Sequence, residues 1–177
     1  MALRSGVDEA ATPKYAHVER ERRWLVALDR LPTLTGQRHV LIEDRYIDNT
    51  ALRLRRMTDS TSNAVALKLT KKYAHADTRA RPIVTAYLDA NEYAVFTALP
   101  AHALVKRRFP IADGGVTFSV DQFLGPLAGL ILAEREAVDA DSLIALPTPV
   151  WALREVTDDP QFAGGTLATH GLPETLP

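Results

Sequence analysis

The sequence contains no cysteine, and this absence excludes several kinds of chemistry. Without thiols the chain can form neither disulfides nor thiolate metal sites, and it has no cysteine nucleophile. The absence also fits a reducing compartment. The segment 1–12 lacks the apolar h-region of a signal peptide. No apolar run approaches the ~20 residues that a membrane-spanning helix needs. We therefore expect a cytoplasmic protein with no membrane partner.

An excess of charge of one sign is also missing. The 177 residues include 21 Lys and Arg against 22 Asp and Glu, which gives a formal net charge of −1 at pH 7. This balance does not indicate a nucleic-acid partner, so any electrostatic function must come from the local arrangement of charges. The length suits one domain with a real core. We expect a flexible tail over residues 1–14 and a single domain over 15–177.

Short alternating segments, separated by turn residues, are what the chain does contain. They predict eight strands, at Tyr15–Leu28, Asp44–Asp48, Ala51–Arg56, Ala64–Thr70, Pro82–Tyr87, Leu104–Pro110, Val116–Phe123 and Leu130–Ala137. A capping box at Asp89 and Glu92 predicts a helix that ends at Pro100. Thr157 or Asp158 is expected to cap a short C-terminal helix. These elements indicate a mainly antiparallel sheet, closed or nearly so, with helices outside.

Charged side chains recur at every second position of the predicted strands, so they share one face of each strand. The shared-face positions are Glu19, Glu21 and Arg23, then Arg53 and Arg55, Lys68, Lys106 and Arg108, Asp121, and Glu134 and Glu136. For a single strand the simpler interpretation is an amphipathic strand with its charges in water. Across six strands, however, almost all of these positions are charged, and the signs are segregated by strand.

The lumen of a barrel is the alternative to solvent for these charged faces. Buried charges need partners, so a lumen of segregated charge is costly when it is empty. A polyanion bridged by cations would satisfy both signs. Carboxylates bind Mg²⁺ or Mn²⁺ through oxygen, and Arg and Lys bind phosphate oxygens. The residues therefore indicate a metal-dependent phosphate site, which we favour over a solvated face.

The order of these segments resembles that of a known superfamily. Glu19-Arg20-Glu21-Arg22-Arg23 is similar to the ExExK signature of the CYTH superfamily, the triphosphate tunnel metalloenzymes. The later segments follow in the family's order, from about His17 to about Ala168, and are Leu52–Arg55, Leu67–Leu69, Lys106–Arg108, Val120–Phe123, Ala133–Glu136 and Arg154–Thr157. The resemblance, strongest to short bacterial members, implies an α+β, mainly β fold: an eight-stranded antiparallel closed β-barrel with helices packed outside.

The resemblance also implies roles for individual residues, which we state as expectations. The expected metal ligands, for Mg²⁺ or Mn²⁺, are Glu19, Glu21, Asp121, Glu134 and Glu136. Asp121 could instead orient other groups of the site. The expected triphosphate-binding residues are Arg23, Arg53, Arg55, Lys68, Lys106, Arg108 and Arg154. Among all of these, the expected catalytic residues are Glu19, Glu21, Arg23 and Lys106. Phosphoryl transfer in such a site depends on positioning and charge stabilisation, without a covalent nucleophile.

Three departures from the family pattern bear on activity. Arg23 and Arg154 stand where the family usually has Lys, and a planar guanidinium is not interchangeable with a titratable ammonium. The strand with Ile83, Thr85 and Tyr87 also lacks the carboxylates that members often carry there. These departures make binding a firmer expectation than turnover.

The leading prediction is metal-dependent hydrolysis of a triphosphate, either inorganic tripolyphosphate or a nucleoside triphosphate. The alternatives are a tunnel that binds polyphosphate or a nucleotide without cutting it, a class IV adenylate cyclase, and a β-barrel scaffold whose charges only form salt bridges. A homodimer is left open, since no residue argues for one. Lys71, Lys72, Arg79 and Arg81 flank a predicted loop. They could rim a tunnel mouth, but we favour the interpretation that they belong to a solvated loop.

Overall fold

The computed structural model describes residues 13–174, which form nine strands, three α-helices and three short 3₁₀ helices. Most of the predicted tail, residues 1–12, and the end of the predicted domain, residues 175–177, lie outside the described residues. The strands are β1 (His17–Val26), β2 (Val40–Ile47), β3 (Leu52–Asp59), β4 (Val65–Lys72), β5 (Ala80–Leu88), β6 (Ala101–Asp113), β7 (Val116–Phe123), β8 (Ile131–Glu136) and β9 (Ala152–Glu155). The helices are α1 (Ala90–Thr97), α2 (Ala140–Ala145), α3 (Gly164–His170), η1 (Leu28–Arg30), η2 (Gly125–Leu127) and η3 (Pro160–Phe162).

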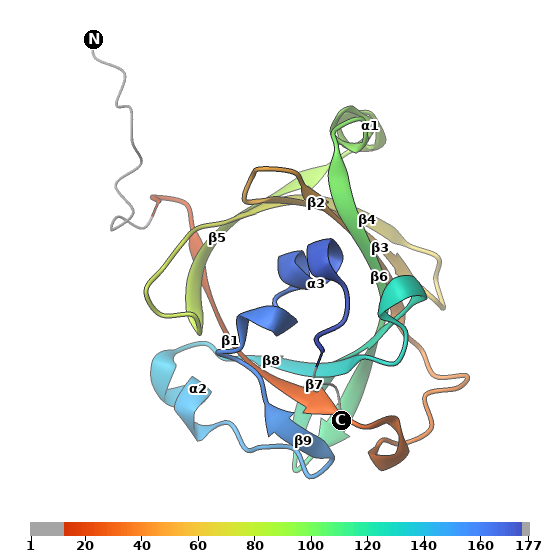
Figure 1. Cartoon of the computed structure of the whole chain (residues 1–177), viewed down its shortest axis with the longest axis vertical. Helices are drawn as coiled ribbons and strands as arrows, with labels where there is room; N and C mark the ends of the chain where they lie inside the picture. Colours follow the sequence, from red (N-terminus) through yellow and green to blue (C-terminus); the bar gives the residue numbers. More distant parts are fainter. Residues whose placement is uncertain (1–12, 175–177) are drawn as a thin grey trace.

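Eight of the strands close into an antiparallel barrel (Figure 1). Their order around the ring is β5-β4-β3-β2-β6-β7-β8-β1. The first half of β1 closes the ring by pairing with β5, so that His17 lies opposite Ile83. The second half of β1 pairs with β8 on one edge and with β9 on the other. The predicted closed eight-stranded antiparallel barrel is therefore confirmed, and β9 is an additional strand that the sequence did not predict.

The strand register determines which side chains face the lumen. Asp44 on β2 lies opposite Arg55 on β3, which lies opposite Lys68 on β4, so these three side chains point to the same side of the sheet. Residues that lie directly opposite each other share a face of the sheet. Followed from strand to strand around the ring, this pairing puts all the charged residues that were predicted to share a face on the inner side of the barrel. Alternation along short segments was therefore enough to predict the facing of these residues.

One apolar core lies outside the barrel, against β1, β6, β7 and β8. Trp24, Phe118 and Trp151 meet edge to face, with ring centroids 5.6 and 5.4 Å apart for the two successive pairs. Leu34, from the segment between β1 and β2, completes the cover over this face. Trp24 and Phe118 are fully buried, so the core holds these strands rigidly together.

A second apolar core lies inside one end of the barrel. The inward-facing residues Leu25, Leu104 and Leu132 pack there against Phe162 of η3 and Leu167 of α3. Figure 1 shows η3 and α3 within the outline of the ring, whereas α1 and α2 lie outside it. The C-terminal helical segment therefore plugs one end of the lumen, and the helices that pack outside are α1 and α2.

The two predicted helix starts have different outcomes. Asp89 and Glu92 form the predicted capping box at the start of α1. The predicted cap of the C-terminal helical segment is wrong, because Asp159 caps η3 instead. Thr157 is engaged elsewhere, accepting from the Arg23 amide at 2.9 Å and donating to Glu155 at 2.7 Å. Among residues 13–174, no helix is long and apolar enough to cross a membrane.

Candidate functional site in the barrel lumen

A cavity of about 380 Å³ occupies the lumen next to the plug. Its walls come from the barrel strands, and residues 157–167 of the plug segment close one side. The predicted site residues that line it are Glu19, Glu21, Arg23, Arg53, Arg55, Lys106, Arg108, Glu134 and Glu136. Most of the predicted set, drawn from β1, β3, β6 and β8, is therefore gathered around one space.

The carboxylates gather on the neighbouring strands β1 and β8. Glu21 lies directly opposite Glu136 in the register, and Glu19 faces the same lumen. Burial raises the pKa of Glu136, and the nearby negative charges of Glu19, Glu21 and Glu134 raise it further. Mutual repulsion of this kind is relieved when a cation binds among the carboxylates. This wall of the lumen is therefore suited to a positive ligand.

Three of these carboxylates are held by cationic side chains. Lys72 donates to Glu19. Glu21 accepts from Arg23 at 2.7 Å, and Glu134 accepts from Arg108 at 2.5 Å. Burial raises the pKa of Glu134, but nearby cations outweigh that effect and hold the pKa well below its usual range. Its carboxylate is therefore ionised at neutral pH.

The carboxyl groups fit a hard divalent cation by their chemistry, since such cations take oxygen ligands. Within residues 13–174, however, no three Asp, Glu, His or Cys side chains converge closely enough to hold a metal ion. The ion pairs explain this arrangement, because each paired carboxylate turns toward an Arg or Lys. Metal binding would require Glu19 and Glu21 to exchange their cationic partners for the ion.

The opposite wall of the lumen is basic. In a ring of eight strands, β3 lies four strands from β8, and therefore faces the acidic wall. Arg55 forms a bidentate pair with the buried Asp44 of β2, with both distances 2.6 Å. The Nε of Arg53 is buried without a hydrogen-bond partner in the described part of the chain. Because the Arg53 side chain lines the cavity, an acceptor such as a phosphate oxygen would satisfy this donor.

Lys106 and Arg108 of β6 form a second basic group. Both form ion pairs with Asp121 on the neighbouring strand β7. Asp121 is fully buried and accepts from Lys106 at 2.5 Å and from Arg108 at 2.7 and 2.6 Å. It does not belong to the lining of the cavity. Its position suits orientation of the two cations, the second of the two roles expected from the sequence.

Besides Asp121, two predicted site residues lie outside the lining of the cavity. Lys68 faces inward, but its Nζ lies 4.9 Å from the ring centroid of Tyr87, outside the set of lining residues. Arg154 of β9 is 45% exposed and lies 3.6 Å from Asp159, with its guanidinium over the ring of Phe162. Lys68 is therefore next to Arg55 on the inner face without lining the cavity, whereas Arg154 lies apart from the other predicted residues.

Several lining residues were missed by the sequence reasoning. The interpretation of Lys72 and Arg81 as solvated loop residues is wrong, because β4 extends to Lys72 and β5 begins at Ala80. Lys72 stands four residues after Lys68, so continued alternation could have found it. Arg81 lies opposite Glu19, and only the long-range register shows this. Tyr46, which lines the cavity next to the plug, was not singled out either.

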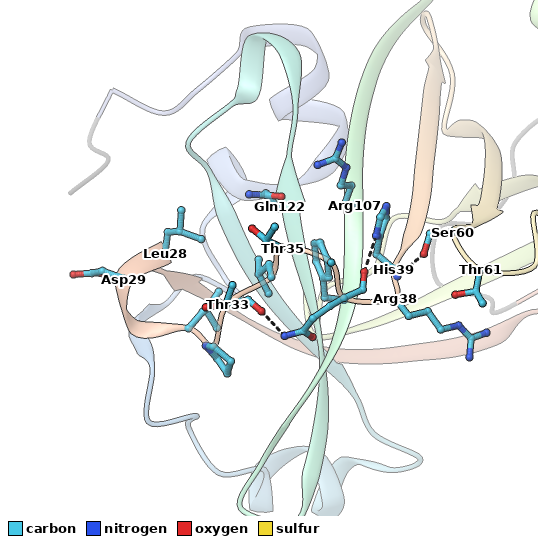
Figure 2. A pocket seen from close by; sticks show the side chains of 16 residues that line it. Leu28, Asp29, Thr33, Thr35, Arg38, His39, Ser60, Thr61, Arg107 and Gln122 are labelled. Atoms are coloured by element: carbon cyan, nitrogen blue, oxygen red, sulfur yellow. Dashed lines mark hydrogen bonds between the residues drawn. The ribbon is translucent and has the colours of Figure 1, made fainter.

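A second cavity, of about 780 Å³, lies on the outer face of the barrel (Figure 2). It is formed by residues 28, 29 and 31–39 together with Ser60, Thr61, Arg107, Phe109 and Gln122. Asp29 is the one carboxylate in its lining, so it lacks the paired acidic and basic walls of the lumen. Although this outer cavity is larger, we place the candidate site in the lumen.

Comparison with known proteins finds a partial sequence match and several similar folds. No family model matches the chain. A 65-residue stretch is 39% identical to an inorganic triphosphatase of Acetivibrio thermocellus, covering 37% of this chain and 40% of that protein. The alignment thus spans less than half of the relative, so the activity of the whole relative is not transferred by it.

Solved structures share the barrel. The inorganic triphosphatase NE1496 superposes with a TM-score of 0.55 at 24% identity, over 85% of this chain and 93% of that one. A protein of Pyrococcus horikoshii OT3, PH1819, gives 0.53 at 19% identity, over 71% and 82%. A putative adenylate cyclase of Bacillus halodurans gives 0.52 at 14% identity, over 73% and 85%. These likenesses, all below 25% identity, show a common fold.

Proposed function

We propose that this chain is a cytoplasmic, metal-dependent triphosphatase that hydrolyses inorganic tripolyphosphate in preference to nucleoside triphosphates. The observation that carries the proposal is the polarised lumen, in which carboxylates on β1 and β8 face guanidinium groups on β3 across a plugged cavity. Such a lumen complements a polyanion with its bound cation, and nothing in it is specific for adenine. The matched stretch of an inorganic triphosphatase supports the same substrate class. We further propose that residues 15–177 act as one domain.

The metal ion would be Mg²⁺ or Mn²⁺, held by Glu19, Glu21, Glu134 and Glu136. When bound, it would neutralise phosphate charge and polarise the attacking water. The raised pKa of Glu136 supports this assignment, because burial and the neighbouring charges of Glu19, Glu21 and Glu134 both disfavour its carboxylate until a cation binds.

The chain's own residues would bind and orient the substrate from the other side. Arg53, Lys106 and Arg108 would donate hydrogen bonds to phosphate oxygens and stabilise the charge that develops during transfer. Burial lowers the pKa of Lys106, but the negative charges of Asp121 and Glu134 oppose that effect. The apolar plug would limit water at its end of the lumen. Catalysis would thus rest on positioning and charge stabilisation.

The test is phosphate release from tripolyphosphate, ATP and pyrophosphate, each with Mg²⁺ and with Mn²⁺. Glu19→Gln and Glu136→Gln should lower the rate by about 10²–10³-fold, because each removes a proposed metal ligand. Glu43→Gln is the matched control. It makes the same change on the outer side of β2, where Glu43 lies 3.8 Å from Arg56. Equal rates in all three variants would refute the proposal, and formation of cyclic AMP from ATP would indicate a cyclase instead.

A tunnel that binds triphosphate without cutting it is the second candidate. The observation that favours it is the set of ion pairs that occupy the carboxylates of Glu19, Glu21 and Glu134. If those pairs persist with ligand, tripolyphosphate and metal should raise the melting temperature while no phosphate is released. Rapid release of phosphate would eliminate this candidate.

A further inference from the structure

We propose that Asp44 is a positioning residue that fixes the guanidinium of Arg55 and thereby leaves that of Arg53 free to bind phosphate. The inference rests on the proposed function and gives the two arginines of the basic wall different roles. Asp44 was not among the residues expected to form the site. It acts on the ligand through the two arginines of β3.

The contacts of Asp44 are almost entirely committed to Arg55. The carboxylate is 1% exposed, and its Oδ1 and Oδ2 accept from Nε and Nη2 of Arg55, each at 2.6 Å. This bidentate geometry fixes the plane of the guanidinium. Burial raises the pKa of Asp44, but hydrogen bonds from Arg55 and its charge outweigh that effect, and the pKa lies below its ordinary value. Asp44 is therefore ionised at neutral pH.

Arg53 is in a different situation, although it lies two residues away on the same face. Its Nε is 3.8 Å from Oδ1 of Asp44, which is too long for a hydrogen bond. That Nε is buried without a partner among the described residues, and the side chain lines the cavity. Asp44 is close enough to stabilise the positive charge of Arg53, but it leaves the Nε donor of Arg53 without a hydrogen bond. A phosphate oxygen could therefore bind this donor without displacing a bidentate partner such as the one that holds Arg55.

The two arginines would then serve different purposes. Arg55 would provide fixed positive charge with one guanidinium edge already bonded, whereas Arg53 would supply the free donors that contact the ligand. The loss of Asp44 would release Arg55 and place two mobile, mutually repelling guanidinium groups side by side. Substrate affinity should suffer most, because orientation is lost while the total positive charge is kept.

The experiment compares Asp44→Asn, Arg55→Gln, their double variant and Glu43→Gln, using KM and kcat for tripolyphosphate at saturating Mg²⁺. Asp44→Asn should raise KM by ~10- to 100-fold, the loss expected for a charge-assisted hydrogen bond, and kcat should fall less. If Asp44 acts through Arg55, the double variant should have a KM no higher than that of Arg55→Gln. Glu43→Gln should match the wild type. An unchanged KM in Asp44→Asn, or single effects that multiply in the double variant, would overturn the inference.

If Asp44→Asn does not fold, a second variant tests the same inference. Arg55→Lys keeps the buried charge pair but loses the bidentate fork, so it should fold and should still raise KM. An unchanged KM in Arg55→Lys would also overturn the inference. The proposed function is tested separately by the wild type. If the wild type neither hydrolyses tripolyphosphate nor gains thermal stability from it, the function itself is wrong. If it does either, and Asp44→Asn equals Glu43→Gln, only the positioning role is wrong.

Discussion

The seating of the plug depends on a glycine pair at the start of α3. A Cβ added at Gly164 would lie 2.0 Å from Oη of Tyr46 and 3.1 Å from Cζ of the same ring. A Cβ added at Gly165 would lie 3.4 Å from the nearest ring carbon, which is close to ordinary van der Waals contact. Gly164→Ala must therefore displace either the Tyr46 ring or the helix, and Gly165→Ala need displace neither.

The two substitutions should differ clearly in stability. Overpacking of a well-packed site costs about 1–3 kcal/mol, so Gly164→Ala should lower the melting temperature by about 2–12 °C in a chain of this size. Gly165→Ala should be neutral or stabilise slightly, because alanine favours the helix over glycine by up to ~1 kcal/mol. Thermal unfolding followed by circular dichroism measures both. The Oη of Tyr46 makes the closest contact, so Tyr46→Phe in the Gly164→Ala background should restore part of the loss.

Equal melting temperatures for Gly164→Ala and Gly165→Ala would refute the reasoning. So would a Tyr46→Phe change that gives no recovery, since the clash would then lie elsewhere. Activity provides a further readout. Displacing the plug opens the closed end of the cavity, so Gly164→Ala should impair hydrolysis of tripolyphosphate more than Gly165→Ala does.

Three other changes test separate parts of the molecule. Arg22→Gln should destabilise the fold by about 1–3 kcal/mol in urea denaturation, because Arg22 donates to Glu155 at 3.0 and 2.6 Å and to the Leu146 carbonyl at 2.6 Å; an unchanged midpoint would contradict this. The pKa of Asp44 is lowered by folding. The stabilisation of the folded state by the ionised Asp44 is therefore complete above its unfolded pKa of about 3.9, and it is lost as the pH falls through the folded pKa. The stability gap between wild type and Asp44→Asn should therefore narrow below about pH 4 in acid titrations, and a constant gap would contradict this. Arg81→Gln should raise KM for tripolyphosphate, whereas Arg107→Gln on the outer wall should not, and equal KM values would exclude Arg81 from the site.

Local alternation predicted the strands and the inward-facing charges well. Arg53 and Arg55, for example, are separated by outward-facing Leu54, and a two-residue period is a property of any strand. The same reasoning could not separate their roles. That difference comes from Asp44 on another strand, and its pairing with Arg55 depends on register between β2 and β3. Partners across a sheet are not encoded in the spacing of either strand alone.

The structure differs most from the sequence-based predictions at the C-terminal end of the chain. Arg154 was expected in the site because its segment resembles a family motif, yet β9 pairs on the outside edge of β1 and leaves the side chain 45% exposed. No role was predicted for the glycine pair at the start of α3. Its close approach to Tyr46 becomes visible when two segments more than 100 residues apart are brought together.

The distribution of the apolar core suggests that the acidic wall is rigid and that part of the basic wall can adapt. Trp24, Val120 and Ala133, on the outer sides of β1, β7 and β8, are all fully buried. On the outer sides of β4 and β5, among the described residues, Pro82 alone is buried. Carboxylates on β1 and β8 are thus mounted on a packed support, whereas Lys72 lies on a strand with little outer cover.

Amide hydrogen exchange should reveal this difference, because protection follows local packing. In the ligand-free protein, amides of β1, β7 and β8 should exchange more slowly than those of β4 and β5. Tripolyphosphate with Mg²⁺ should then slow β4 and β5 the most, as Lys72 exchanges Glu19 for phosphate and the wall becomes ordered around the ligand. Uniform protection before ligand, or ligand effects confined to β1 and β8, would show that the rigid and adaptable walls have been assigned wrongly. If the ligand protects mainly β4 and β5, part of the binding energy is used to order this side of the barrel, which has the least apolar packing on its outer face.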